Sequence, residues 1–323
     1  HAVAVRPDFD AYTEVSHGIL AVLESVSPAV ESASIDEAYL DLTTAVGGWG
    51  SARAIGEHLR ALVHDEQRIT CSVGIGPNRL LAKMASVAAK PDGLFEVAPG
   101  QVEEFLLPLP VERLVGVGES TAARLHARGI VTIADLAAAP RVDLQRRFGR
   151  HAGALLAELA RGRDSSRVVS RPGERGVGNQ ETFGADTADE GVISAELLRL
   201  ALKVSARLRA AGQVGRTLTL HVRYPDFTTT SAATTFEEPT AATDDLHEAA
   251  LALHGRLNRR RRPVRRLGLR VTGLVDALRA HHQPALDEPE RGWAEAERAS
   301  DAVIARFGPA AVQRAVLTGR RRP

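Results

Sequence analysis

The run Ser34-Ile35-Asp36-Glu37-Ala38-Tyr39-Leu40-Asp41-Leu42 places two adjacent carboxylates in an otherwise apolar strand. Burying a carboxylate without a partner costs free energy, so cations commonly neutralise such a pair. Mg²⁺ is one candidate, because it takes carboxylate oxygens together with substrate phosphates. Taken alone, an Asp-Glu pair is more often a turn or a solvated edge, so the neighbouring sequence has to decide between the two interpretations.

The sequence around this run predicts an α/β layer. Apolar residues recur at helical spacing before the run and after it, and short apolar stretches lie between the helical segments. The expected elements, in chain order, are an internal strand over 2–5, a helix over 12–26, a strand over 33–43, a helix over 51–65, a strand over 69–73 and a helix over 78–89.

Beyond this layer the character of the sequence changes three times. Short helices rich in small residues run to about residue 163, and an Arg-rich stretch with Pro172 and Gly173 then indicates an interdomain linker. The next segment has the pattern strand, helix, paired strands, helix, strand, which predicts a second α+β domain. The expected boundaries are 1–107, 108–163, 164–176, 177–275 and 276–323.

Composition bounds the class of protein. The chain has 323 residues, 44% hydrophobic and 25% charged, which is enough for two or three domains with their own cores. One cysteine, Cys71, excludes an internal disulfide and a cysteine-based zinc site. No run resembles a signal peptide or a membrane span, so we expect a cytoplasmic protein. The first residue is His1 rather than Met, from which we expect a truncated gene product.

Two motifs in order carry a family resemblance. The run 34–41 is similar to the signature of the Y-family (translesion) DNA polymerases. The stretch Cys71-Ser72-Val73-Gly74-Ile75-Gly76-Pro77-Asn78-Arg79-Leu80-Leu81-Ala82-Lys83, followed by Ala89-Lys90-Pro91-Asp92-Gly93, resembles the next block of that family. The similarity continues over residues 1–275, so the chain is identified as a member of the family, of the bacterial DNA polymerase IV type.

The resemblance implies an α+β multidomain fold. Residues 1–107 would be an incomplete palm, 108–163 a small helical thumb with a helix-hairpin-helix, and 164–176 a linker. Residues 177–275 would be a little finger with a four-stranded sheet and two helices, and 276–323 a C-terminal tail.

The resemblance also implies the chemistry. In this family the primer 3′-hydroxyl attacks the α-phosphate of a deoxynucleoside triphosphate, and two Mg²⁺ ions act on the attacking and leaving oxygens. Asp36 and Glu37 match the paired catalytic metal ligands, provided that the strand begins at a bend beside Ser34. Lys90 matches the residue that contacts the triphosphate, and Asp41 is expected to be structural. Lys83 could contact template or phosphate, or lie on the surface.

Three features predict contact with DNA. Gly116 and Gly118 precede a helix start, where backbone N–H groups can approach a phosphate, although a Gly-x-Gly turn alone is weak evidence. Arg124 and Arg128 would reinforce this contact. Eight arginines lie between residues 256 and 270, and Arg266 and Arg270 alternate with apolar residues, so one face of a strand would be cationic. The arginines that match the DNA-contacting strand of the family are Arg265, Arg266 and Arg270. The linker arginines Arg163, Arg167, Arg171 and Arg175 would lie along the duplex.

The sequence departs from the family at both ends. The first palm strand with another metal-binding aspartate, the steric gate and the fingers have no counterpart here, and Asp8 and Asp10 are better explained as helix caps. We therefore expect the chain to bind DNA but to polymerise poorly. The stretch Gln283-Pro284-Ala285-Leu286-Asp287 lacks the aromatic anchor of clamp-binding peptides, so no sliding-clamp motif is evident.

Two functions follow. The first is an error-prone, template-directed polymerase, a monomer that acts on damaged primer-template DNA. The second is a non-catalytic DNA-binding paralogue of the family. Retention of Asp36, Glu37 and Lys90 favours the enzyme, because a paralogue without catalysis has no physical need of them.

Overall fold

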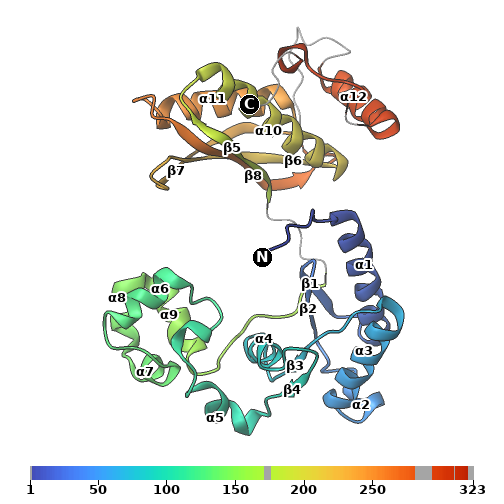
Figure 1. Cartoon of the computed structure of the whole chain (residues 1–323), viewed down its shortest axis with the longest axis vertical. Coiled ribbons are helices and arrows are strands. Elements are labelled where there is room, and N and C mark those ends of the chain that lie inside the picture. The colour runs from blue at the N-terminus through green and yellow to red at the C-terminus, as the bar shows by residue number, and fades with distance from the viewer. Residues whose placement is uncertain (1, 171–175, 281–292, 309, 319–323) are drawn as a thin grey trace. The chain divides into compact units, whose positions relative to one another are not determined.

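The computed structural model describes residues 2–170, 176–280, 293–308 and 310–318 (Figure 1). The chain forms two compact units, His1–Pro172 and Gly173–Pro323. Each unit has its own hydrophobic core. No helix in the described ranges is long and apolar enough to cross a membrane.

The first unit opens on helix α1 (Phe9–Val26). Asp8 caps this helix, since its Oδ1 accepts a hydrogen bond from the backbone N–H of Ala11 at 3.1 Å, which confirms the expected cap. Residues 2–8 form neither helix nor strand. The strand expected over residues 2–5 is therefore wrong. Val3 and Val5 pair with no strand among the described residues and are 87% and 83% exposed.

The decisive run forms a hairpin and not the single strand expected over 33–43. Strand β1 (Val30–Ser34) pairs antiparallel with β2 (Glu37–Leu40), and the turn between them is Ile35-Asp36. Ser34 Oγ donates to Asp36 Oδ1 at 2.6 Å, which stabilises the turn. Glu37 thus begins a strand directly after a bend, as the metal-site interpretation required.

Helices α2 (Val46–Trp49) and α3 (Ala52–Gln67) follow, and Ser51 caps α3. Strand β3 (Val73–Ile75) begins four residues after the expected start of the strand over 69–73, because parallel pairing with β4 (Leu94–Glu96) fixes its register. Helix α4 (Arg79–Ala88) packs closely on β3. A Cβ on Gly74 would lie 2.1 Å from the Ala82 carbonyl oxygen, so glycine permits this contact.

A cluster of short helices completes the first unit. Leu80 and Met84 of α4 pack into the core of this cluster, together with Leu125, Leu136 and Leu156. Its elements are η1 (Pro99–Gln101), α5 (Val102–Leu106), η2 (Val111–Arg113), α6 (Glu119–His126), α7 (Ile133–Ala138), α8 (Arg141–Phe148) and α9 (Arg150–Leu159).

The segment 164–170 after α9 belongs to the first unit. It runs past α4 toward β1 and β2 (Figure 1). Asp164 Oδ2 accepts from the Leu80 N–H at 3.1 Å, and Ser170 Oγ donates to the Pro28 carbonyl at 3.2 Å. This part of the expected linker is therefore fixed to the first unit. Arg171 and Arg175 lie outside the described residues.

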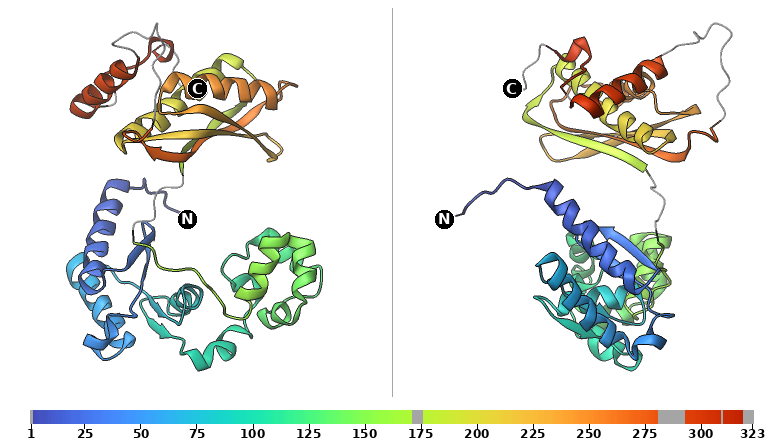
Figure 2. Two further views of the ribbon diagram at one scale, coloured as in Figure 1. Left: turned by 180° about the vertical axis from the view of Figure 1, so that it is seen from behind. Right: turned by 90° about the vertical axis from the view of Figure 1, so that its right-hand side faces the viewer.

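The second unit is a four-stranded antiparallel sheet with helices on one face, as predicted (Figure 2). The strand order is β5-β8-β6-β7. Leucine and valine side chains of α10, α11 and the inner sheet face form its core. The elements are β5 (Gly176–Thr187), α10 (Glu190–Ala210), β6 (Gln213–Arg223), β7 (Thr229–Thr240), α11 (Thr243–Leu257) and β8 (Val264–Asp276).

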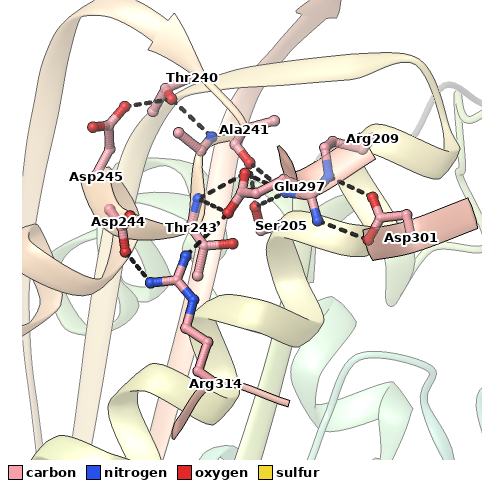
Figure 3. Close-up of polar contacts among 11 residues, drawn as sticks. Ser205, Arg209, Thr240, Ala241, Thr243, Asp244, Asp245, Glu297, Asp301 and Arg314 are labelled. Atoms are coloured by element: carbon pink, nitrogen blue, oxygen red, sulfur yellow. Dashed lines mark hydrogen bonds and ion pairs between the residues drawn. The ribbon is translucent and has the colours of Figure 1, made fainter. Parts of the chain in front are cut away.

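Helix α12 (Trp293–Phe307) is attached to this unit through a polar cluster, and η3 (Ala315–Leu317) follows it (Figure 3). Glu297 of α12 accepts from Arg209 Nη1 at 2.8 Å and from the Thr243 N–H at 3.1 Å. Ala242, the residue at the cap position of α11, offers no side-chain acceptor, so Glu297 caps α11 from another helix. Asp301 and Arg314 extend the cluster toward Arg209 and Asp244.

Candidate functional site

An open groove of about 1700 Å³ in the first unit brings three sequence-predicted residues together. Asp36, Glu37 and Lys90 all line it, and Lys83 lies beside them. The β1–β2 hairpin supplies the carboxylates, and α4 and the residues directly after it supply the cations. The groove therefore pairs anionic and cationic groups that are far apart in the sequence.

Asp36 is an exposed carboxylate at the tip of the hairpin. The hydrogen bond from Ser34 is the largest effect and lowers its pKa. Burial opposes this effect, and the charges of Lys83 and Lys90 lower the pKa further. Asp36 is thus ionised at neutral pH and open to a ligand in the groove.

Glu37 is held from both sides. Burial would raise its pKa, but hydrogen bonds from Lys83 and Tyr39 outweigh burial and lower the pKa. Lys83 Nζ contacts Oε2, and Tyr39 Oη donates to Oε1 at 3.0 Å. Burial, followed by the contact with Glu37, raises the pKa of Tyr39 to about 12, so its hydroxyl remains a proton donor at pH 7.

Sequence reasoning missed part of this arrangement. Lys83 was expected at template, phosphate or surface, yet its partner is Glu37. Tyr39 was not singled out. The sequence allowed this contact to be predicted, because residues i and i+2 of a strand share a face and Tyr39 lies two residues after Glu37.

The carboxylates fit Mg²⁺ chemically. Among the residues that the structure describes, no group of three or more His, Cys, Asp or Glu side chains could enclose a metal. Mg²⁺, however, usually binds through one or two carboxylates, with substrate phosphates and water completing its shell. Asp36 and Glu37 supply hard oxygen donors of that number and kind.

The Gly116–Gly118 turn leaves backbone accessible. Gly116 has φ +91°, Gly118 is the N-cap of α6, and a Cβ on either would meet nothing within 4 Å. Arg124 does not reinforce this turn in the expected way. Its guanidinium stacks on the Phe148 ring at 4.3 Å and donates to the Arg147 carbonyl, so it is engaged inside the helical cluster.

The outer face of the second unit carries the predicted cations. Leu267, Leu269 and Val271 of β8 are buried, whereas Arg266 and Arg270 fall on the opposite phase, so the predicted alternation is confirmed. Arg265 has the phase of the buried residues. Its guanidinium lies 3.4 Å from Asp186 Oδ1 and 4.9 Å from the centre of the Phe227 ring, which makes it the least available of the three.

Comparison with known proteins gives matches over most of the chain. Three family models match, described as impB/mucB/samB family (residues 1–87), DNA polymerase-iota, thumb domain (112–164), and impB/mucB/samB family C-terminal domain (174–286). The chain is 40% identical over 274 residues to DNA polymerase IV of Alkalilimnicola ehrlichii, covering 85% of this chain and 77% of that protein. It is 38% identical over 293 residues to DNA polymerase IV of Methanoculleus marisnigri, covering 89% and 79%.

Solved structures agree with these relatives. A Y-family DNA polymerase chimera, Dbh-Dpo4(243-245)-Dbh, is 27% identical with a TM-score of 0.75, covering 85% of this chain and 79% of that one. An insertion ternary complex of Dbh DNA polymerase, also 27% identical, has a TM-score of 0.55 over the same shares. From its sequence, its domains and its fold, the chain belongs to the Y-family DNA polymerases of the DNA polymerase IV type, error-prone DNA-directed enzymes of translesion synthesis.

Proposed function

We propose that this chain performs template-directed nucleotidyl transfer on damaged primer-template DNA, with Asp36 and Glu37 as the ligands of Mg²⁺. The observation that carries the proposal is the groove in which a turn presents two ionised carboxylates beside two lysines. The tip of the β1–β2 hairpin, helix α4 and the residues directly after α4 come together there from separate parts of the sequence. A solvated turn gives no reason for this convergence.

Each side chain has a task in this proposal. Mg²⁺, when bound, neutralises phosphate charge and favours the alkoxide form of the primer hydroxyl. Asp36 remains ionised and offers free oxygen lone pairs at the tip of the turn. Tyr39 orients one oxygen of Glu37, while Lys83 balances the charge of the other. Lys90 neutralises triphosphate charge as a point cation.

DNA would be held by its backbone. The N–H groups of Gly116 and Gly118 suit a phosphate, and Arg266 and Arg270 suit a phosphate path along the sheet. These contacts are independent of sequence, as lesion bypass requires. Relatives support DNA and nucleotide as partners, since a Dbh DNA polymerase was solved as an insertion ternary complex and as a post-insertion binary complex.

Other expectations stand differently. The comparisons give no support to an impaired polymerase, an expectation that rested on the missing counterparts of the first palm strand, the steric gate and the fingers. The segment 283–287, in which no clamp motif is evident, lies outside the described residues. A monomeric state and a cytoplasmic location stay predictions.

Primer extension with Mg²⁺ tests the proposal. The chain is compared with Asp36→Asn and with the control Glu57→Gln, which changes an exposed carboxylate on α3. We expect extension by the unmodified chain and the control but not by Asp36→Asn, with equal DNA binding by all three. Extension that survives Asp36→Asn would refute the assigned site. Tight DNA binding without extension by the unmodified chain would instead favour the non-catalytic paralogue.

A further inference from the structure

Two cations on α4 face two carboxylates on the hairpin. Arg79 and Lys83 are four residues apart and therefore share a face of the helix. Arg79 Nη2 lies 2.9 Å from Glu31 Oε1, and Lys83 contacts Glu37. The second pair belongs to the proposed metal site, whereas nothing so far assigns a role to the first.

Tyr39 connects the two pairs. It lies directly opposite Glu31 in the β1–β2 register, and it shares a face with Glu37. Its ring lies beneath the Arg79 guanidinium, 4.4 Å from Cζ to the ring centre, while its hydroxyl donates to Glu37. A guanidinium over an aromatic face attracts the ring electrostatically. Arg79 therefore restricts the ring whose hydroxyl orients Glu37.

The same ion pair holds the segment 164–170. Arg79 Nη1 donates to the Arg167 carbonyl at 2.9 Å, and Glu31 Oε2 accepts from the Val169 N–H at 2.8 Å. Both side chains are largely enclosed, with exposed fractions of 24% for Arg79 and 12% for Glu31. One guanidinium thus contacts the segment, the carboxylate and the ring together.

We propose that Arg79 is a positioning residue that couples the orientation of Glu37, through Tyr39, to the docking of residues 167–169 on the first unit. The role of Glu37 in this inference rests on the proposed function. The planar fork of arginine offers donors in two directions and a face for stacking, and lysine cannot reproduce all three contacts. Such coupling is reciprocal, so disturbing the tyrosine has to loosen the segment as well.

Hydrogen exchange followed by mass spectrometry tests the segment side on the full chain. Arg79→Ala and Arg79→Lys are expected to increase exchange at residues 167–170. Neither variant has the planar guanidinium that contacts both the Arg167 carbonyl and Glu31. Tyr39→Leu removes the ring but leaves in place the groups of Arg79 and Glu31 that bind the segment, and it is expected to increase exchange there too. The control Arg53→Ala removes an exposed arginine that pairs with Glu57 within its own helix, and it is expected to leave the segment unchanged. Unchanged exchange in Tyr39→Leu overturns the coupling.

Mn²⁺ binding tests the active-site side. Free Mn²⁺ is measured by electron paramagnetic resonance with a dideoxy-terminated primer-template and a nucleotide present. Tyr39→Phe keeps the ring and loses only the hydroxyl, so we expect about 10-fold weaker binding, typical of lost support for a ligand, with normal exchange at 167–170. Arg79→Ala is expected to weaken Mn²⁺ binding in the same direction. If Arg79→Ala frees the segment but binds Mn²⁺ as tightly as the unmodified chain, the coupling is wrong.

The two proposals fail in different ways. If Asp36→Asn leaves Mn²⁺ affinity unchanged, the metal site of the proposed function is misplaced. The exchange of Tyr39→Leu still decides whether the tyrosine and the segment are coupled. Equal melting temperatures of Tyr39→Phe and the unmodified chain exclude general loss of structure as the cause of a change in Mn²⁺ affinity.

Discussion

Glu37 in the first unit and Glu297 in the second unit use the same local chemistry under opposite conditions of exposure. Each carboxylate accepts from a cationic side chain and from a neutral donor: Lys83 and Tyr39 for Glu37, Arg209 and the Thr243 N–H for Glu297. Glu297 also accepts from Arg314 Nη2 at 3.4 Å. The side chains of Glu37 and Lys83 are 31% and 30% exposed. Those of Glu297 and Arg209 are 10% and 15% exposed.

This difference in exposure decides what each carboxylate can do. A partly exposed ion pair contributes little to stability, and water or a ligand can replace its partner at small cost. Water reaches an enclosed pair poorly, so removal of one member weakens the compensation of a charge that solvent cannot replace. Glu37 is therefore suited to binding and Glu297 to fixing α12 on the second unit.

The largest effect should follow from Glu37→Gln. The substitution keeps shape and the contact with Tyr39 but removes the charge that a metal needs. We expect the rate of Mg²⁺-dependent extension to fall at least about 100-fold, equivalent to about 2.7 kcal/mol of transition-state stabilisation. Urea unfolding should change by less than about 0.5 kcal/mol. A large loss of stability with little loss of rate would show that Glu37 stabilises the fold and does not bind the metal.

The second effect should follow from Glu297→Ala. It removes one of the two carboxylates that pair with Arg209 and leaves Asp301 as the other, and it removes the cap of α11. We therefore expect unfolding of the second unit to cost about 2 kcal/mol less. Glu295→Ala on the same helix is the control, because Glu295 pairs with Arg298 at 46% exposure. Equal effects of the two substitutions in urea unfolding would show that α12 is not fastened by its buried carboxylate.

The sequence predicted the second unit better than the first. Periodicity located α10, α11 and the alternation of Arg266 with Leu267, because one face of each element is buried in a single core. In the first unit the strand expected over 33–43 proved to be a hairpin, since Ser34 and Asp36 make a turn through side-chain hydrogen bonds that periodicity does not register. Short strands such as β3 are positioned by pairing with distant residues.

The candidate site was predictable in its carboxylates but not in its supports. Asp36 and Glu37 follow from one short motif and Lys90 from a second, and each motif is contiguous in the sequence. The contacts of Glu31 with Arg79 and with the Val169 N–H span 48 and 138 positions, so only the fold reveals them. Glu297 was missed for the same reason, since its partners lie on α10 and at the start of α11.

A third prediction extends the comparison from carboxylates to cations. Arg270 is exposed on the sheet, whereas Arg265 is engaged by Asp186 and Phe227. Arg270→Ala should weaken binding of primer-template about 5-fold near 0.1 M salt and reduce the slope of log affinity against log salt by about 1. Arg265→Ala should do less. Fluorescence anisotropy over a salt series measures both, and a larger slope change for Arg265→Ala would show that its contact with Asp186 is readily given up for phosphate.

The smallest effect concerns acid. The stability of the second unit should begin to fall at a higher pH than that of the first unit. Burial lowers the pKa of His254 and of His247 in the second unit, and the Glu190 carboxylate 3.6 Å from His254 only partly opposes this. The folded state therefore favours neutral histidine, and the unfolded chain binds more protons once the pH falls through its ordinary value of about 6.5. Stability of the second unit is complete above that pH and decreases below it.

The shifted carboxylates of the first unit act at lower pH. Hydrogen bonds from Thr43 lower the pKa of Asp41, and those from Thr132 and Val131 lower the pKa of Asp135. Their contribution is present above an unfolded pKa of about 3.9 and is lost only as the pH falls through the lower folded values. Calorimetry between about pH 7 and 5 should therefore show the transition of the second unit, identified by its response to Glu297→Ala, moving first. Replacing His247 and His254 by Gln should flatten that movement, and a slope that persists in the double variant would assign it to other groups.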